Sequence, residues 1–535
     1  MNGPLPASLA PPDPEALGST QVADVIQFRQ QMGSISRHSS IFLLGTVFTA
    51  ATNYLFKVYL ARALGADALG IYALGMTIVG FLSIFNALGL PKSAVRFVAT
   101  YYTTGKFDLL RGFIGRSILV LLTCNVLLGI GVLYAGPWIA LHFYHAAVLT
   151  NYIGLFALIM ILGVLNIFLG EVLVGYKAVA RRTLLTNFVS NPAMMVLTIV
   201  LLVMGFGLRG YILAQVGSSV LLLALLTWAV WKMTPKSARS SLFQLPPFEK
   251  NVVSFSTAVF GLGFLLFFTT SADKVLIGFY LDTRAVGMYA VANSLVTFVP
   301  ILLQSVNQIF SPTIADLWTR KQRELLGRLF QTLTRWIFGL TIPLAMVMIL
   351  FAPALMRIFG RDFEPGWPIL VIGTLGQLVN CGVGSAGTLL LMSGNEQALI
   401  RIQGYMALTI VFLNLVLIPQ WGITGAAVAM AVTVATGNFW YLYEVRRRMG
   451  LTPYNRSYVR LLAPVAASST VLLLIRTIFS LPPHEWVIVG AALLLGYVTF
   501  VATALLVGLD ADDRVIVHAV LAKLRGMRSD IEVLR

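Results

Sequence analysis

Two lysines stand inside stretches that are otherwise apolar enough to cross a bilayer. Lys57 lies in "YLFKVYLARALG" (54–65), and Lys274 opens "KVLIGFYLDTRAVG" (274–287). A charge at the centre of a membrane helix costs about 2.5 to 3.5 kcal/mol on insertion scales. Each lysine therefore either extends its long side chain to the interface or neutralises an anionic group within the membrane.

The composition indicates what kind of protein surrounds these lysines. Of the 535 residues, 58% are hydrophobic and only 11% are charged, and the mean hydropathy is +0.84. A water-soluble domain of this length has no core large enough for so much apolar surface, so we predict a polytopic membrane protein. The two cysteines, Cys124 and Cys381, lie in separate apolar segments and predict neither a disulfide framework nor a metal site.

Stretches of about 20 apolar residues, the length that spans a bilayer, can be placed fourteen times along the chain. We therefore predict an all-α fold with about fourteen transmembrane helices. Their expected ranges are 39–62, 68–90, 116–136, 150–175, 183–205, 210–231, 251–280, 284–309, 329–352, 366–393, 397–419, 423–444, 459–480 and 485–508.

The positive charges predict the orientation, because cytoplasmic loops are enriched in lysine and arginine. Most of the 38 Lys and Arg residues fall in alternate connections of this arrangement, which we assign to the inner side. We expect a multi-pass protein of the cytoplasmic (inner) membrane with both termini in the cytoplasm. The net charge of +17 then reflects topology and attraction to an anionic leaflet, not nucleic-acid binding. The outer side would carry only Arg62, Arg209, Arg284, Arg357, Arg361 and Arg476.

The chain also contains an internal repeat. Residues 57–81 align on 274–298 without a gap. Six helices followed by six more place both copies in the membrane in the same sense, as a parallel repeat about an axis along the membrane normal. Lys57 and Lys274 would then lie on opposite walls of one central cleft. The aligned identities are Lys57/Lys274, Val58/Val275, Leu64/Leu281, Ala68/Ala285, Gly70/Gly287, Tyr72/Tyr289, Ala73/Ala290, Val79/Val296 and Phe81/Phe298.

The expected organisation follows from the helices and the repeat. The first thirty-odd residues are polar and Pro-rich and do not have the pattern of a signal peptide; within them "VADVIQFRQQM" suits either a short interfacial helix or a disordered arm. The predicted parts are a cytoplasmic tail (1–37), two pseudo-symmetric six-helix bundles (38–232 and 251–446) joined by a linker (233–250), helices thirteen and fourteen (447–509) and a cytoplasmic amphipathic tail (510–535).

Four stretches occur in order across both halves: "YLARALGADALGIYAL", "LGLPKSAVRFVA", "FGRDFEPGWPIL" and "LNLVLIPQWGITGAAVA". With them the chain resembles the polysaccharide-transport, oligosaccharide-lipid flippases of the multidrug/oligosaccharidyl-lipid/polysaccharide exporter superfamily. The resemblance implies two facing bundles that move polyprenyl-diphosphate-linked sugar units to the outer leaflet by alternating access, for O-antigen, capsule or exopolysaccharide synthesis. It implies polysaccharide polymerases and glycosyltransferases as further partners, and no cofactor.

A diphosphate that crosses a region of low dielectric constant needs cations and hydrogen-bond donors in place of its water. Lys57 and Lys274 are the first candidates, with Arg62 at the outer mouth and Arg96 or Arg335 at the inner one. The competing interpretation is that these side chains reach the interface or form structural ion pairs.

Acidic and amide side chains in the apolar segments complete the candidate site. Glu171 and Asp273 either pair with the cavity lysines or carry coupling protons, or they serve only as local ion pairs and caps. The amides suit sugar hydroxyls in a wet cavity, and equally suit contacts between helices. They are Asn187, Asn191, Gln304, Asn307, Gln308, Gln377 and Asn380.

Three other functions remain to be compared with the flippase. A proton- or sodium-coupled drug or cation antiporter of the same superfamily and a lipid II flippase would share the fold. A membrane glycosyltransferase, polymerase or ligase would need a sizeable outer loop for its catalytic residues, and the predicted outer connections are too short. Five histidines and 21 acids, most of them in loops, assemble neither a nucleophile triad nor a metal cluster. We therefore expect a transporter without catalytic residues.

Overall fold

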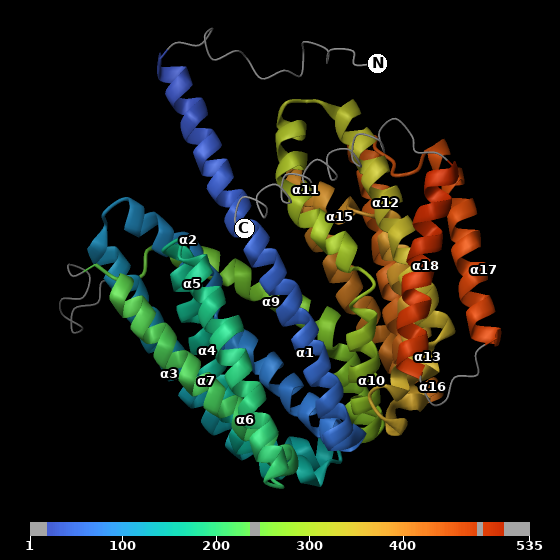
Figure 1. Cartoon of the computed structure of the whole chain (residues 1–535). Coiled ribbons are helices and arrows are strands. Elements are labelled where there is room, and N and C mark those ends of the chain that lie inside the picture. Colours follow the sequence, from blue (N-terminus) through green and yellow to red (C-terminus); the bar gives the residue numbers. More distant parts are fainter. Residues whose placement is uncertain (1–18, 236–246, 479–484, 508–535) are drawn as a thin grey trace, which may run out of the picture. The chain divides into compact units, whose positions relative to one another are not determined.

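The structure, a computed structural model, describes residues 19–235, 247–478 and 485–507 (Figure 1). The chain divides into two units, Met1–Val58 and Tyr59–Arg535, which are described separately. All regular secondary structure in the described ranges is helical. The prediction of an all-α protein is confirmed.

Helix α1 (Ser19–Ala87) begins in the first unit and continues into the second. Its backbone is already helical at Ser19, so the short helix considered for the N-terminal region is part of a longer one. At Gly65 the backbone leaves the helical region with a φ of 78°, which glycine adopts without strain. This break falls in the gap predicted between the first two spans.

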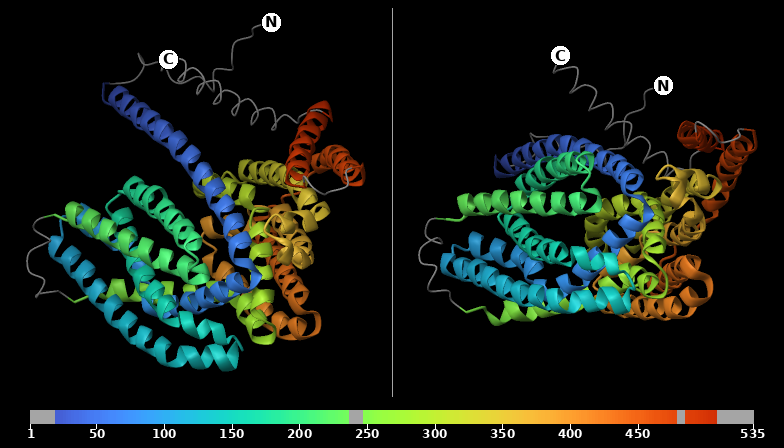
Figure 2. Two further views of the ribbon diagram at one scale, coloured as in Figure 1. Left: turned by 60° about the horizontal axis from the view of Figure 1, so that its bottom comes forward. Right: turned by 90° about the horizontal axis from the view of Figure 1, so that it is seen from below.

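The helices of the first half that follow α1 lie side by side in the second unit (Figures 1 and 2). Two of the elements are π-helices, in which the backbone hydrogen bond joins residues five apart. The elements are α2 (Leu90–Thr103), α3 (Phe107–Trp138), η2 (π, Ile139–Phe143), η3 (Ala147–Tyr152), α4 (Ile153–Gly175), α5 (Val179–Thr183), η4 (π, Leu184–Ser190), α6 (Asn191–Val203) and α7 (Gly207–Met233).

The second half begins after the predicted linker, of which residues 236–246 lie outside the described ranges. Its elements are α9 (Lys250–Tyr280), α10 (Thr283–Val296), α11 (Ile301–Thr319), α12 (Arg323–Leu350), α13 (Ala352–Arg357), η5 (Arg361–Gly366), α14 (Trp367–Val383), α15 (Ala386–Met392), α16 (Glu396–Met449), η6 (Arg456–Leu461), α17 (Leu462–Ile478) and α18 (Glu485–Val507). The predicted amphipathic helix at 510–535 lies outside the described residues.

Eleven helices of the described part are long and apolar enough to cross a membrane, and twelve if α10 and α11, bent by 51°, form one span. The 54 residues of α16 are interrupted at Gly422, where φ is 58°. At 1.5 Å per residue, a helix of this length is far longer than the hydrocarbon core is thick. The predicted count of about fourteen is not confirmed.

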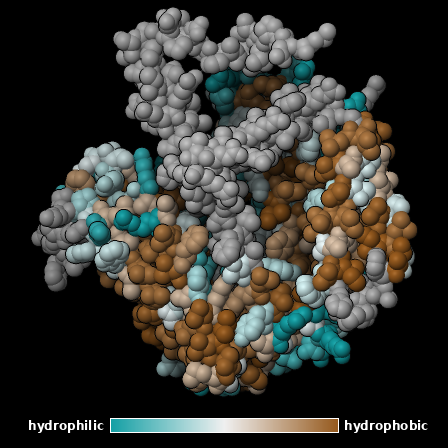
Figure 3. Space-filling view, viewed as in Figure 1, coloured by the Kyte–Doolittle hydropathy of each residue, from teal (hydrophilic) through white to brown (hydrophobic). Residues whose placement is uncertain are grey.

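The described surface of the helices is broadly apolar (Figure 3). Large side chains such as Tyr134, Val203 and Leu506 are at least 80% exposed. A soluble monomer rarely exposes apolar patches on this scale, whereas side chains that face lipid do so without cost. The protein is therefore a multi-pass membrane protein.

Two segments between the predicted spans are largely helical. Residues 91–115 contain α2 and the start of α3, and residues 310–328 contain the end of α11 and the start of α12. Pro91 stands in the first turn of α2, where its missing N–H leaves no hydrogen bond unmade. These helices extend beyond the apolar windows because helix formation there does not require a continuous apolar sequence.

The two repeats meet at a reciprocal glycine contact within the second unit. A Cβ at Gly70 of α1 would clash with the Thr283 carbonyl of α10, and a Cβ at Gly287 of α10 would clash with the Ala66 carbonyl of α1. Gly70 and Gly287 are repeat-related, and so are Ala66 and Thr283. The local pseudo-two-fold axis therefore passes between these helices, and it requires a residue without a side chain on both of them.

Candidate functional site

Lys274, the candidate cation of the second half, lies in the last third of the spanning helix α9 (Lys250–Tyr280). Its Nζ donates to the Thr270 carbonyl at 3.4 Å, so the ammonium bends back along its own helix. The neighbouring Asp273 is 3% exposed, and its carboxylate accepts the Lys274 backbone N–H at 2.8 Å. An ammonium-bearing residue and a buried carboxylate are thus neighbours in sequence on one candidate membrane span.

Lys57 is exposed on α1 and belongs to the first unit, whereas Lys274 belongs to the second. The prediction that these two ammonium groups line opposite walls of one cleft therefore stays a prediction. Their sequence relation is unchanged, since both occupy the same place in the two repeats.

Arg62 lies at the end of α1 that precedes Gly65, among polar contacts between the halves. Its Nε donates to the carbonyl of Ile358 at 2.7 Å. Close by in the sequence, the Asp67 carboxylate accepts the Thr283 hydroxyl. The exposed guanidinium thus contacts the second half directly and connects the two repeats at this end.

Arg96 lies on α2, where that helix contacts the start of α9. Its guanidinium stacks over Phe97 and over Phe255 of α9, at 5.5 and 5.0 Å from the ring centroids. Cation–π contacts of this kind hold an exposed arginine in place. Between the same two helices, the hydroxyls of Ser93 on α2 and Ser256 on α9 are 2.7 Å apart.

One turn further along α2, Tyr101 donates its hydroxyl to Glu249, which precedes α9, at 2.7 Å. Burial and the adjacent carboxylate raise the pKa of Tyr101 above its usual value. The phenol therefore stays protonated at neutral pH and remains a donor. Together with the Arg96 stack, this contact fastens the start of α9 to the first half.

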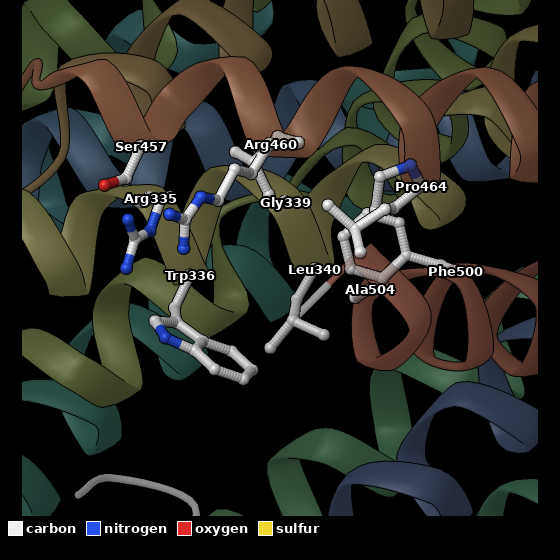
Figure 4. A pocket seen from close by; sticks show the side chains of 11 residues that line it. Arg335, Trp336, Gly339, Leu340, Ser457, Arg460, Pro464, Phe500 and Ala504 are labelled. Atoms are coloured by element: carbon white, nitrogen blue, oxygen red, sulfur yellow. The ribbon is translucent and has the colours of Figure 1, made fainter. Parts of the chain in front are cut away.

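Arg335 lies deeper in the protein than the other candidate arginines and faces a small pocket between α12, η6, α17 and α18. Only 5% of Arg335 is exposed, and the pocket has a volume of about 50 Å³. Arg335 and Arg460 direct their guanidinium groups toward one end, whereas Pro464 and Phe500 form an apolar wall at the other (Figure 4). The arginine thus faces the two C-terminal helices.

Glu171 is buried in α4 and bonded to two cations of the first half. Its carboxylate lies 3.1 Å from Lys92 Nζ of α2 and 3.3 Å from an Arg182 Nη atom of α5. A carboxylate that is 6% exposed is stabilised by such pairing. These contacts correspond to the local ion pair among the interpretations of Glu171. Its role in coupling stays a prediction.

The amides occupy three different settings. Asn187 lies in the π-helix η4, where the helical turn is wider than in an α-helix, and Asn191 opens α6. The other five lie on α11 and α14: Gln304 and Gln308 are exposed, the buried Oδ1 of Asn307 has no hydrogen-bond partner among the described residues, and Asn380 donates to Gln377 at 2.9 Å.

The structure also shows polar residues that the sequence analysis did not select. Lys92 and Arg182 are the partners of Glu171, and both belong to the positively charged connections expected on the inner side. Asn414 in α16 is fully buried, and neither end of its amide has a hydrogen-bond partner among the described residues. The sequence marks Asn414 as a candidate, since "FLNLVL" (412–417) contains a single amide in an apolar run.

The described residues contain no group of three His, Cys, Asp or Glu side chains that could hold a metal ion. Cys381 is buried and Cys124 is half-buried, and neither forms a disulfide.

The chain is similar in sequence to a known protein family. Residues 59–365, more than half of the chain, match the family model described as polysaccharide biosynthesis protein. Over 176 residues the chain is 27% identical to a probable flippase, AglR, of Haloferax volcanii, a match that spans 31% of this chain and 36% of that protein.

Two solved structures share the fold. The lipid II flippase MurJ in an inward closed conformation superposes with a TM-score of 0.66 at 15% identity, over 87% of this chain and 98% of that one. An inward-facing multidrug transporter of the MATE family superposes with a TM-score of 0.60 at 15% identity, over 74% and 94%. Because the family model matches more than half of the chain, the chain belongs to the polysaccharide biosynthesis protein family.

Proposed function

We propose that this protein is a flippase that moves polyprenyl-diphosphate-linked oligosaccharide units across the cytoplasmic membrane by alternating access, for surface polysaccharide synthesis. The observation that carries the proposal is the family match over residues 59–365, which includes the charged helix α9. The sequence similarity to a probable flippase also supports the proposal.

The substrate explains the charge in α9. A diphosphate carries about two negative charges, and hydrocarbon offers it neither water nor counter-ions. Lys274 supplies a cation in the membrane region, and Lys57 supplies its repeat-related counterpart. Two ammonium groups match the charge of one diphosphate, so we assign them as its ligands.

The arginines have different roles in this proposal. Arg62 and Arg96 have contacts of their own, with the Ile358 carbonyl and with two phenylalanine rings, which supports their assignment to holding helix ends. Arg335 lies beside Arg460, and the pair suits an anionic group on the inner side. The amides of α11 and α14 are assigned to sugar hydroxyls.

Purified protein in liposomes tests the proposal against its alternatives. A fluorescent polyprenyl-diphosphate oligosaccharide should move between leaflets faster in these liposomes than in protein-free ones. Lipid II in a parallel sample tests the lipid II flippase, and a cationic dye with a proton or sodium gradient tests the antiporter. Exchange of the dye without movement of the oligosaccharide lipid would refute the flippase.

The inner-membrane orientation has its own test. We propose that α2 and the end of α16 face the cytoplasm and that η5 faces outward, with both termini inside. Single cysteines at Lys92 and Arg361, in a background without Cys124 and Cys381, should react with a membrane-impermeant reagent only in inverted vesicles and only in intact cells, respectively. The opposite pattern would reverse the proposed topology.

A further inference from the structure

A cavity of about 420 Å³ lies between the two repeats within the second unit. Its walls come from α1 and η2 of the first half and from α9 and α16 of the second. An occupant would therefore touch both halves. The lining residues are Thr77, Ile78, Phe81, Leu82, Ile139, Phe143, Tyr144, Phe267, Phe268, Ala272, Val275, Leu276 and Val411.

The walls of this cavity offer nothing to a polar molecule. Thr77 and Tyr144 are the exceptions by residue type, but the Thr77 hydroxyl already donates to the Ala73 carbonyl at 2.7 Å, and the surface that faces the space is apolar. At about 30 Å³ per molecule, more than ten waters would fill the volume, and a buried water needs two to four polar partners. The chemistry of the walls selects a hydrocarbon.

Aromatic rings give the cavity a firm wall. Phe81 of α1 and Phe267 of α9 pack with their centroids 5.3 Å apart, and Phe143 packs against Phe279 at 4.7 Å. Rings have few rotatable bonds and are held here by their neighbours, so the space does not close by simple rotamer changes. A preformed apolar space of this kind binds apolar ligands.

A cation stands close to the same part of α9. Lys274 lies two turns from the cavity residue Phe267 on the same helix face, since seven residues complete almost two turns. Its Nζ contacts the carbonyl of Thr270, which lies between them in the sequence. Lys274 lies within the stretch of α9 that lines the cavity (267–276) but is not itself part of the lining. An ammonium group beside an apolar cavity is complementary to an anionic head with a hydrocarbon chain.

We infer that this cavity holds the polyprenyl chain of the translocated lipid, close to its diphosphate, while the lipid is bound between the halves. The inference rests on the proposed function, which supplies the diphosphate lipid. It adds a chain-binding site to the charge-binding site. Because both repeats line the cavity, the chain contacts the two parts that move in alternating access.

Photo-labelling in liposomes tests the occupant. The probes are a polyprenyl diphosphate and a phosphatidylglycerol, each with a diazirine in its chain, in vesicles of phosphatidylethanolamine and phosphatidylglycerol. The polyprenyl probe should label peptides that contain 77–82 and 267–276, and excess unlabelled polyprenyl diphosphate should reduce this labelling at least about tenfold. Equal labelling by the phospholipid probe, without competition, would make this a site for bilayer chains and overturn the inference.

A matched pair of substitutions on α9 tests the site itself. Leu276→Trp fills the cavity, whereas Leu266→Trp adds the same ring at a position that is 46% exposed and outside the lining. We expect Leu276→Trp to lower labelling and flipping about tenfold or more, and Leu266→Trp to change both less than about twofold. Equal behaviour of two folded variants would refute the cavity as the site.

The two proposals fail in different ways. If wild-type protein moves the oligosaccharide lipid but the cavity is neither labelled nor sensitive to Leu276→Trp, the flippase stands and the chain site is wrong. If wild-type protein moves no oligosaccharide lipid, the proposed function is wrong. Labelling then shows separately whether the cavity binds a polyprenyl chain.

Discussion

The two halves of this protein share the same backbone contact but differ in their charged groups. At their junction Gly70 and Gly287 approach the opposite repeat in the same way. Away from it, Glu171 with Lys92 and Arg182 in the first half corresponds to Thr388, Ile309 and Leu399 in the second. The ion pairs of the first half therefore have no counterpart at the repeated positions.

A repeated tyrosine shows the same divergence. Tyr72 accepts a hydrogen bond from Gln215 at 2.7 Å, whereas Tyr289 lies against Met430 and the Asp273 carboxylate. Steric constraint at the junction tolerates only glycine, but an interior polar group can change whenever its partner changes. Duplication thus fixes the shape of the scaffold and leaves each half free to acquire its own charges.

Substitutions at the glycine junction between the halves should destabilise the protein most. Gly70→Ala and Gly287→Ala each force a methyl group into a backbone carbonyl, so we expect each to destabilise the protein by about 3 kcal/mol or more. Gly80→Ala on the same α1 helix is the control, because its new Cβ would meet Phe267 at an ordinary 3.6 Å. Unfolding in detergent micelles measures the three variants, and a junction variant as stable as the control would disprove the reciprocal contact.

Loss of the Glu171 ion pairs should give the next largest destabilisation, and only in the first half. Glu171→Ala leaves Lys92 and Arg182 without their buried carboxylate, and we expect a loss of about 2 kcal/mol. The repeat-related Thr388→Ala should cost less than about 1 kcal/mol. The same unfolding assay compares them; equal losses would mean that the pairing of Glu171 contributes nothing specific.

Substitution of buried amides should change stability differently in the two halves, by a smaller amount than the changes above. Asn86 donates to Asn125 at 2.7 Å in the first half, so Asn125→Leu should destabilise by about 1 to 2 kcal/mol. Asn414 has no partner among the described residues, so Asn414→Leu should be neutral or stabilising. A clear destabilisation by Asn414→Leu in unfolding experiments would show that this amide has an unseen partner, such as water.

The features that could be predicted from sequence are the positions of most helices, from hydropathy, and the breaks between them, from glycine. Apolar windows placed the helices, and the breaks at Gly65 and Gly422 fall between predicted spans because the chain needs a positive φ there. The π-helix that holds Asn187 was not predicted, since its extra residue per turn leaves no periodic signal. The helices α2 and α11 were missed in part because their polar residues lie outside apolar windows.

The partners of the candidate residues could not be predicted. Glu171 and Lys92 are separated by 79 positions in the chain, and Arg335 meets Arg460 from another helix. Such pairs depend on how helices pack and rotate, and hydropathy carries little of that information. The sequence therefore located charges in the membrane but not what each of them contacts.

The central claim is that intramembrane lysines neutralise the diphosphate of a lipid-linked glycan. Flipping of a fluorescent polyprenyl-diphosphate oligosaccharide by reconstituted protein tests it directly, with Lys57→Gln/Lys274→Gln compared with Lys57→Arg/Lys274→Arg. We predict that the glutamine pair lowers the rate at least about tenfold while the arginine pair keeps most of it, because charge is preserved. Unchanged flipping by the folded glutamine pair would contradict the claim.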